Sequence, residues 1–282
     1  MTRKAILITG CQRSGTTLMN LILDSHPRIW SIDEDKFDFP ALYSYLQTPL
    51  PQAPEFVSFK LPRFAHMLPF IAMLPTCKVL WCVRNPLDVV ASMISLKLKM
   101  QMGDAEVDIP WAVHPNGGWF DVNSTYWTLD EKQKRGLNDH IAEFGRLTEK
   151  FTQLSASPEN LKNVDRRDCV YIGALCWTIK NYLPSLYREG NIDFHPVRYE
   201  DLVTNPRERI AELLDYLGTD WDDQVLMHHR MHNGTSIGKT SNSRAIDQNS
   251  LGTGKNSLTP EEQELVASIC GEAAAIWNYT FE

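Results

Sequence analysis

Short apolar runs alternate with segments of helical periodicity along much of this chain. Residues 5–9, 56–59 and 79–83 form runs that are typical of buried strands. Shorter strands are expected over 29–32 and at 197–199. Strands that alternate with helices build a mostly parallel sheet covered by helices on both faces, so the pattern predicts an α/β fold. In such folds, ligands bind beyond the carboxyl ends of the strands.

Several helix ends are marked by residues that cap or start a helix. Asn205-Pro206 begins a helix that stops at Gly218. The last helix is expected to begin with Thr259 as its N-cap and Pro260 at its first position, where the missing proline N–H costs nothing. Other helices are expected over 16–25, 137–152 and 167–189.

Residues 100–135 break the alternation. They contain Trp111, Trp119 and Trp127 together with the pair Gly117-Gly118. A long loop inside a compact domain is usually functional or disordered, and its aromatic content argues against disorder. We therefore expect a loop insertion that covers a pocket for the substrate (below, the acceptor), in which the three tryptophans contact that substrate. A packed surface loop without substrate contact is the alternative.

Composition limits the class of protein. With 282 residues, 43% of them hydrophobic, the chain can form one substantial core, and we expect a single domain over residues 1–282. A net charge of −7 argues against nucleic acid as a partner. The six cysteines show no C-x-x-C pair or zinc pattern, so reduced thiols are expected. No run approaches the ~18 apolar residues of a membrane span, and the first residues lead into a strand rather than a signal peptide. These features predict a cytoplasmic protein without membrane contact.

The first strand leads into a glycine loop and a helix. Residues 6–17 read Ile-Leu-Ile-Thr-Gly-Cys-Gln-Arg-Ser-Gly-Thr-Thr. Gly10 and Gly15 have the spacing of a nucleotide-binding P-loop, G-x-x-x-x-G-K-[ST], but Thr16 replaces the lysine. The backbone N–H groups and the helix N-terminus can still bind a phosphate. Without the lysine that reaches the β- and γ-phosphates, we expect a nucleotide with a single 5′-phosphate.

A second strand delivers an arginine to the same edge of the predicted sheet. Residues 78–93 read Lys-Val-Leu-Trp-Cys-Val-Arg-Asn-Pro-Leu-Asp-Val-Val-Ala-Ser-Met, so Arg84 follows the strand and Ser92 lies about two turns into the next helix. A guanidinium group recognises phosphate oxygens well. This segment is therefore a candidate for binding a second phosphate.

Together, the loop and the arginine segment resemble the donor-binding elements of sulfotransferases, which use 3′-phosphoadenosine 5′-phosphosulfate (PAPS) as sulfuryl donor. The chain looks like a soluble bacterial-type small-molecule sulfotransferase with a P-loop-like α/β fold. The resemblance implies that Arg13 holds the 5′-phosphate, that Arg84 and Ser92 hold the 3′-phosphate, and that no metal is needed. The loop residues implied to bind the donor with Arg13 are Ser14, Gly15, Thr16 and Thr17.

Two later segments extend the resemblance. Arg-Tyr-Glu-Asp-Leu-Val, with Tyr199, is similar to a recurrent sulfotransferase stretch whose tyrosine contacts the nucleotide. Leu-Gly-Thr-Gly-Lys-Asn-Ser, with Lys255, resembles the Gly-Lys-Trp-Arg element that closes over the 3′-phosphate, although Asn256 and Ser257 replace the tryptophan and arginine. The glycines of this segment would allow a nest of backbone N–H groups that binds an anion.

The resemblance also implies which residues are catalytic. Lys60, followed by Leu-Pro, is similar to the Lys-x-Pro element whose lysine points at the sulfonate. The segment from His26-Pro27 onward resembles one of tyrosylprotein sulfotransferases, and the alignment places their general base at Glu34. His26 is the alternative base, since cytosolic small-molecule sulfotransferases use histidine.

The acceptor is less clearly indicated. The carboxylates of Asp33 and Asp35 and the tryptophan-rich segment suggest a cationic or flat small molecule, such as a guanidinium alkaloid or another secondary metabolite. A protein tyrosine is an alternative acceptor. Two other functions stay open: a P-loop kinase of a small metabolite and a non-catalytic nucleotide-binding protein. His228, His229 and His232 lack an evident partner ligand, so a metal site is not expected.

Overall fold

The structure is a computed structural model, and it describes residues 3–47, 54–74, 76–102, 105–114, 116–155, 160–161, 164–236 and 240–281. These residues group into two compact units, and each unit is discontinuous in sequence. Unit 1 comprises Met1–Arg84 and Pro184–Asn249, and unit 2 comprises Asn85–Leu183 and Ser250–Glu282.

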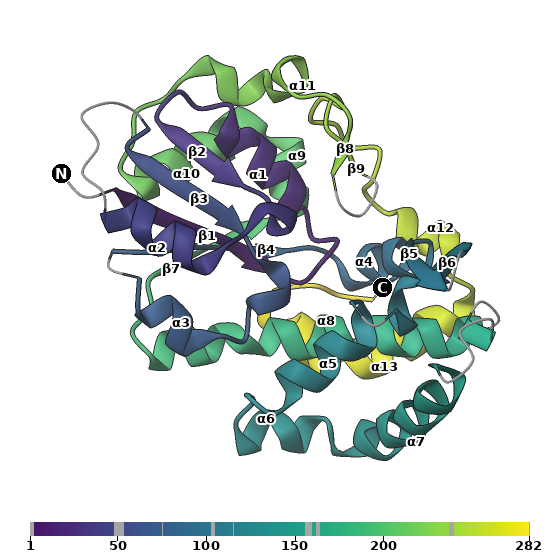
Figure 1. Cartoon of the computed structure of the whole chain (residues 1–282). Helices are drawn as coiled ribbons and strands as arrows, with labels where there is room; N and C mark the ends of the chain where they lie inside the picture. Colours follow the sequence, from purple (N-terminus) through teal and green to yellow (C-terminus); the bar gives the residue numbers. More distant parts are fainter. Residues whose placement is uncertain are drawn as a thin grey trace. The chain divides into compact units, whose positions relative to one another are not determined.

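Unit 1 is built on a five-stranded parallel sheet (Figure 1). Its strand order is β2-β3-β1-β4-β7, and each neighbouring pair is parallel. The carboxyl ends of all five strands therefore meet at one edge of the sheet. The strands are β1 (Lys4–Gly10), β2 (Ile29–Ile32), β3 (Phe56–Lys60), β4 (Lys78–Val83) and β7 (Phe194–Arg198).

Both faces of the sheet are covered. Ile6 and Ile8 of β1 share one face, because side chains alternate along a strand, and they belong to a buried cluster with residues of α1 and α10. On the opposite face, the Trp81 ring of β4 meets Tyr187 edge-on, with centroids 5.4 Å apart. This arrangement confirms the predicted α/β fold. The helices of unit 1 are α1 (Thr16–Asp24), α2 (Phe39–Gln47), α3 (Leu68–Ala72), α9 (Tyr199–Thr204), α10 (Pro206–Leu217) and α11 (His228–Met231).

Among its described residues, unit 1 also has three short 3-10 helices and a small antiparallel ladder. The 3-10 helices are Glu34–Lys36, Pro62–Phe64 and Asp223–Leu226, and β8 (Thr235–Ser236) pairs antiparallel with β9 (Thr240–Ser241). Tyr199, which we expected at the end of a strand, instead opens α9.

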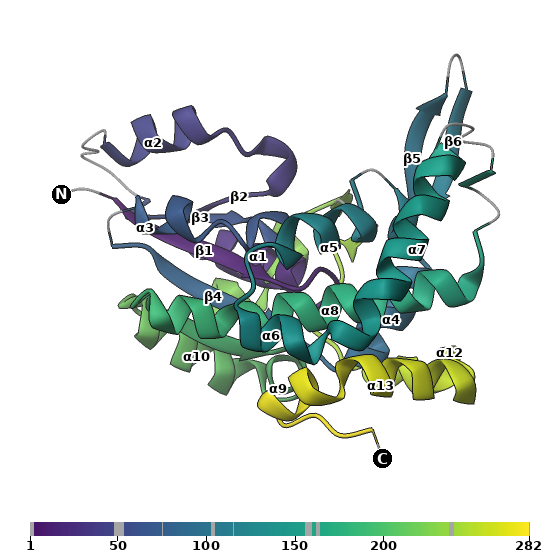
Figure 2. The ribbon, with the colours of Figure 1, turned by 90° about the horizontal axis from the view of Figure 1, so that it is seen from below.

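Unit 2 is mainly helical and carries a β-hairpin (Figure 2). The hairpin strands β5 (Lys97–Met102) and β6 (Ala105–Pro110) pair antiparallel. Helix α8 (Arg166–Glu189) contains residues of both units, since unit 1 resumes at Pro184. The other helices of unit 2 are α4 (Pro86–Ile94), the 3-10 helix Trp111–Val113, α5 (Gly118–Tyr126), α6 (Glu131–Gly136), α7 (Asn138–Ser155), α12 (Thr253–Ser257) and α13 (Pro260–Ile276).

The expected long loop at 100–135 is wrong as a description of structure, because the described part of this segment forms β6, α5 and α6 and the end of β5. The sequence Lys-Leu-Lys-Met-Gln-Met of β5 alternates polar and apolar side chains, which is the period of a strand. The glycine pair turns the chain around a tryptophan: a Cβ on Gly118 would lie 2.6 Å from the Trp111 ring. Residues 103, 104 and 115 lie outside the described residues.

The predicted helix ends agree with the structure. Thr259 caps α13 by accepting a hydrogen bond from the Glu262 N–H at 3.2 Å, and Pro260 is the first helical residue. Helix α10 begins at Pro206 and ends at Gly218, whose φ of +75° lies in the left-handed region. Within the described ranges, every helix is too short or too polar to span a bilayer.

Candidate active site

The glycine loop after β1 is shaped by two positions that cannot hold a side chain. Gly10 has a φ of +125°, and a Cβ there would lie 2.2 Å from the carbonyl oxygen of Cys82 in β4. Gly15 has a φ of +91°, and its Cβ would lie 2.6 Å from the Tyr199 ring. Because the loop is held against β4 and Tyr199 in this way, its backbone direction is fixed.

The loop ends at a helix N-terminus that suits an anion. Gly15 precedes α1 without a side-chain cap, and the first turn contains no acidic residue. The first N–H groups of an α-helix have no acceptor within the helix. Beside them, the buried Ser14 hydroxyl has no hydrogen-bond partner among the described residues, and Thr16 is also buried. Donors of this kind suit a phosphate group, so binding of a phosphate by Ser14–Thr17 stays a prediction.

Two arginines add positive charge to the same loop. The Arg84 Nη1 donates to the Arg13 carbonyl oxygen at 3.3 Å, and the Arg84 guanidinium lies over the Tyr199 ring at 4.5 Å. Burial, and then the charge of Arg84, lower the pKa of Arg13 from its ordinary value. The structure therefore brings Arg13, Arg84 and Tyr199 together, and the two guanidinium groups would be stabilised by an anion between or beside them.

A buried lysine lies between two carboxylates at the same edge of the sheet. Lys60, the last residue of β3, is only 1% exposed. Its Nζ lies 2.7 Å from the Asp33 Oδ1 and 2.9 Å from the Glu34 Oε1. Asp33 Oδ1 also accepts the backbone N–H of Glu34 at 2.7 Å, so it fixes both the lysine and the start of the 3-10 helix Glu34–Lys36.

The structure shows a partner for Asp33 that the sequence did not predict. We expected Asp33 to contact a cationic substrate, but its carboxylate is paired with Lys60. The reason is the register of the sheet: Ile32 of β2 is opposite Phe59 of β3, which places the next residues, Asp33 and Lys60, side by side. Asp35, by contrast, is exposed.

The alternative base, His26, is held by backbone groups. His26 is 2% exposed. Its Nε2 lies 2.9 Å from the Asp220 carbonyl oxygen, and its Nδ1 accepts the Arg28 N–H at 3.2 Å. Both ring nitrogens are therefore engaged, which favours a structural role for this histidine.

In unit 2, the segment with Lys255 is held by a carboxylate that our sequence analysis missed. The buried Asp88 of α4 accepts the N–H groups of Gly252 at 3.0 Å and Gly254 at 2.7 Å. These N–H groups were expected to form a nest for a phosphate, but the carboxylate occupies them. Ser92 lies four residues after Asp88, on the same face of α4.

The three tryptophans predicted to contact the acceptor lie in different environments. Trp111 is 4% exposed and packs against Gly118 in the core of unit 2. Trp119 donates its Nε1–H to Thr148 Oγ1 at 3.2 Å. Trp127 is 75% exposed and meets the Tyr126 ring edge-on. Burial of Trp111 argues against direct contact with a substrate.

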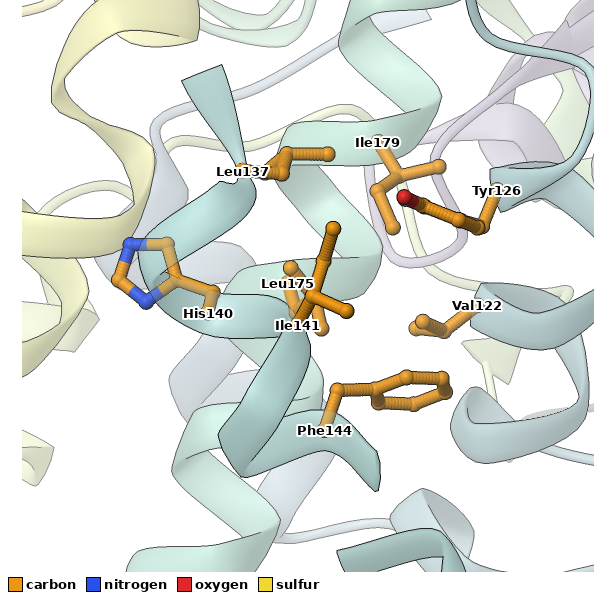
Figure 3. Close-up of a pocket in the computed structure, with 8 residues that line it drawn as sticks. All are labelled: Val122, Tyr126, Leu137, His140, Ile141, Phe144, Leu175 and Ile179. Atoms are coloured by element: carbon orange, nitrogen blue, oxygen red, sulfur yellow. The ribbon is translucent and has the colours of Figure 1, made fainter. Parts of the chain in front are cut away.

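A small apolar pocket lies between the helices of unit 2 (Figure 3). Its cavity volume is about 30 Å³, far below the roughly 300–1,000 Å³ of most small-molecule sites. None of the three tryptophans lines it, so we do not assign the acceptor to this pocket. The lining residues are Val122, Tyr126, Leu137, His140, Ile141, Phe144, Leu175 and Ile179.

Of the three histidines near residue 230, His228 is held by a backbone carbonyl group. His228 is fully buried, and its Nε2 lies 3.0 Å from the Arg244 carbonyl oxygen. Burial is the main cause that lowers the pKa of His228 to about 4. In the described part of the chain, no group of three or more histidine, cysteine, aspartate or glutamate side chains could hold a metal ion.

Comparison with known proteins identifies the family of this chain. The sulfotransferase domain family matches residues 3–278. Among solved structures, the sulfotransferase domain of the Synechococcus PCC 7002 olefin synthase is 16% identical, with a TM-score of 0.57, over 99% of this chain and 96% of that chain. The sulfotransferase domain from the curacin biosynthetic pathway is 15% identical, with a TM-score of 0.56, over 99% of this chain and 98% of that chain. Sulfotransferase STF9 from Mycobacterium avium is 12% identical, with a TM-score of 0.50, over 99% and 78%. No curated protein sequence gave a significant match.

The chain therefore belongs to the sulfotransferase family. It is an enzyme that transfers a sulfuryl group from PAPS. This assignment decides against the kinase alternative. The low identities of the solved structures show the fold alone, so the acceptor and the roles of individual residues need their own argument.

Proposed function

We propose that this enzyme sulfates a hydroxyl or amine group of a small molecule, with Glu34 as general base and Lys60 as the cation that faces the transferred group. The observation that carries the proposal is the contact between Lys60 and Glu34, at the sheet edge that also carries the glycine loop and Arg84. A base and a cation at one place are what in-line sulfuryl transfer requires.

The residues of the loop would hold the donor. Arg13, Ser14 and the first N–H groups of α1 fit the 5′-phosphate, which leaves as charge develops on it. Thr16 and Thr17 open that helix and would add their N–H groups and hydroxyls. Arg84 and Tyr199 would bind the nucleotide from β4 and α9, and we propose that Ser92 and Lys255 bind its 3′-phosphate.

The proposed reaction is a single displacement at sulfur. The acceptor oxygen or nitrogen forms a bond to sulfur as the bond from sulfur to the 5′-phosphate oxygen breaks. Glu34 takes the acceptor proton, and adenosine 3′,5′-bisphosphate leaves with both phosphates. Lys60 and Arg13 would stabilise the negative charge on the sulfuryl oxygens and the leaving phosphate.

Aromatic side chains near the end of β3 favour an acceptor with an apolar body. Phe59 directly precedes Lys60, and the Phe37 ring lies 5.9 Å from that of Phe59 and 6.4 Å from that of the partly exposed Phe64. A cationic acceptor, such as a guanidinium alkaloid of secondary metabolism, is the narrower hypothesis. It has less support, because Asp33 and Glu34 are paired with Lys60 and, of these three carboxylates, only Asp35 is exposed.

A screen of matched acceptors tests this choice. Phenols and apolar alcohols would be compared with guanidinium- or ammonium-bearing alcohols of similar size, at fixed PAPS, by measuring release of adenosine 3′,5′-bisphosphate. Turnover with the neutral set and none with the cationic set would support an apolar acceptor. The reverse result would restore the cationic hypothesis, and turnover only with tyrosine peptides would overturn the small-molecule proposal.

We also propose that the enzyme is a single-domain cytoplasmic protein. The family match spans residues of both units. All six cysteines are free and five of them are buried, which suits a reducing compartment. The negative net charge of −7 favours neither nucleic acid nor an anionic membrane surface as a partner.

Arg84→Ala is expected to raise the KM for PAPS roughly 10- to 100-fold, the loss expected for hydrogen bonds to a charged group. Arg188→Ala is the matched control, because Arg188 also lies over an aromatic ring, that of Phe194, at 5.0 Å. Steady-state kinetics with varied PAPS measures the effect. Equal KM values for the two variants would remove Arg84 from the donor site.

A further inference from the structure

Asp88 joins two segments of unit 2 that lie far apart in the sequence. It belongs to the first turn of α4 and is 2% exposed. Its Oδ2 accepts the Gly252 N–H at 3.0 Å, and its Oδ1 accepts the Gly254 N–H at 2.7 Å. Hydrogen bonds to an ionised carboxylate are roughly twice as strong as neutral ones, so this contact is a firm attachment point for the segment.

The segment at 252–254 rests directly on the backbone of α4. Gly252 has a φ of +67°, which favours glycine. A Cβ on Gly254 would lie 2.3 Å from the carbonyl carbon of Leu87. The adjoining Lys255 is exposed, and its carbonyl oxygen accepts a hydrogen bond from Gln263 Nε2 at 3.1 Å. The backbone that carries the Lys255 side chain is therefore fixed on both sides.

The face of α4 that holds this segment also carries Ser92. Asp88 and Ser92 are four residues apart in one helix, and such residues lie on the same face one turn apart. Asp88 thus brings the segment with Lys255 to the face that presents the Ser92 hydroxyl.

We propose that Asp88 is a positioning residue for recognition of the donor's 3′-phosphate. Its carboxylate holds the segment at 252–254, and through it Lys255, on the face of α4 that carries Ser92. The proposal rests on the proposed function, in which Ser92 and Lys255 bind that phosphate. Because both glycine N–H groups are taken by Asp88, the lysine side chain rather than the backbone of this segment would meet the phosphate.

Two nucleotides that differ only in the 3′-phosphate test the proposal. Binding of adenosine 3′,5′-bisphosphate and of adenosine 5′-monophosphate would be measured by calorimetry for the full chain and for Asp88→Asn. The asparagine keeps one acceptor oxygen but turns an NH₂ group toward the second N–H. We expect the bisphosphate Kd to rise roughly tenfold, as for loss of one charge-assisted hydrogen bond, and the monophosphate Kd to stay unchanged.

A matched control variant and a double-mutant cycle between Asp88 and Lys255 separate positioning from general destabilisation. Asp130→Asn makes the same change at another aspartate of unit 2 that accepts a backbone N–H, that of Gln133 at 2.8 Å, and should change neither Kd. Lys255→Ala should weaken binding of the bisphosphate alone. The double variant with Asp88→Asn should lose less binding free energy than the sum of the losses in the two single variants.

A further variant perturbs the same segment without touching Asp88. Gly252→Ala places a Cβ where no atom lies within 4 Å, so its strain comes from the positive φ alone. This variant should also weaken binding of the bisphosphate selectively, and it keeps the proposal testable if Asp88→Asn does not fold. Equal losses for both nucleotides, or additive effects in the cycle, would overturn the proposal. If the unaltered enzyme showed no preference for the bisphosphate, the donor assignment itself would fall.

Discussion

Glu34→Gln is expected to lower turnover about 10²- to 10⁴-fold, the usual contribution of a general base, while leaving the Kd for adenosine 3′,5′-bisphosphate unchanged. Glutamine keeps the shape of the side chain but cannot take the acceptor proton. Lys60 keeps its contact with Asp33 at 2.7 Å, so the fold around it should persist. Single-turnover transfer to an accepted substrate, with saturating PAPS, measures the chemical step.

Two control variants decide between the candidate bases. Asp35→Asn changes the exposed neighbour of Glu34 and should leave turnover near that of the unaltered enzyme. His26→Gln should lower stability, because both ring nitrogens are engaged, but the folded fraction should keep its activity. An active Glu34→Gln together with an inactive, folded His26→Gln would transfer the role of base to His26.

Lys60→Met is expected to reduce kcat about 10²- to 10³-fold. In other enzymes, removal of one group that stabilises the developing charge lowers kcat by this factor. It should also lower the free energy of unfolding by up to about 3 kcal/mol, since two mostly buried carboxylates lose their common cation. Urea denaturation and transfer kinetics measure the two effects separately.

The double variant Asp33→Asn with Lys60→Met separates the two roles of the lysine. Removing one carboxylate together with the lysine should recover part of the lost stability, because less uncompensated charge stays buried. It should recover none of the lost kcat. Recovery of kcat along with stability would show that Lys60 is structural and would leave the sulfuryl group without its proposed cation.

The features that were predictable from the sequence depend on neighbouring residues. The strand, the glycine loop and the start of α1 are contiguous between Lys4 and Thr17, so their pattern is local. The Thr259 cap and the Pro206 helix start are local as well. These are the places where the α/β fold and the phosphate loop could be recognised without a structure.

The features that were missed depend on which segments pair. Asp33 meets Lys60 only because β2 and β3 are neighbours in a given register, and the sequence does not state the strand order. Likewise, Asp88 and Gly254 are joined across the long stretch that contains α5 to α11. The hairpin strand β5 was missed for another reason: its alternation is clear, but the nearby tryptophans and glycines are also typical of a long loop.

The strand order also bears on how the chain is made. Strand β4 pairs with β7, so Val79 has its partner only once Phe194 has been synthesised. The core around Ile6 and Ile8 also includes Val225. During synthesis, the amino-terminal strands emerge long before these partners, and pairing between distant segments is slow. A nascent or truncated chain that stops before Phe194 would leave one edge of β4 bare and open to pairing with other chains. The first unit of this enzyme can therefore finish folding only after most of its second unit has been translated.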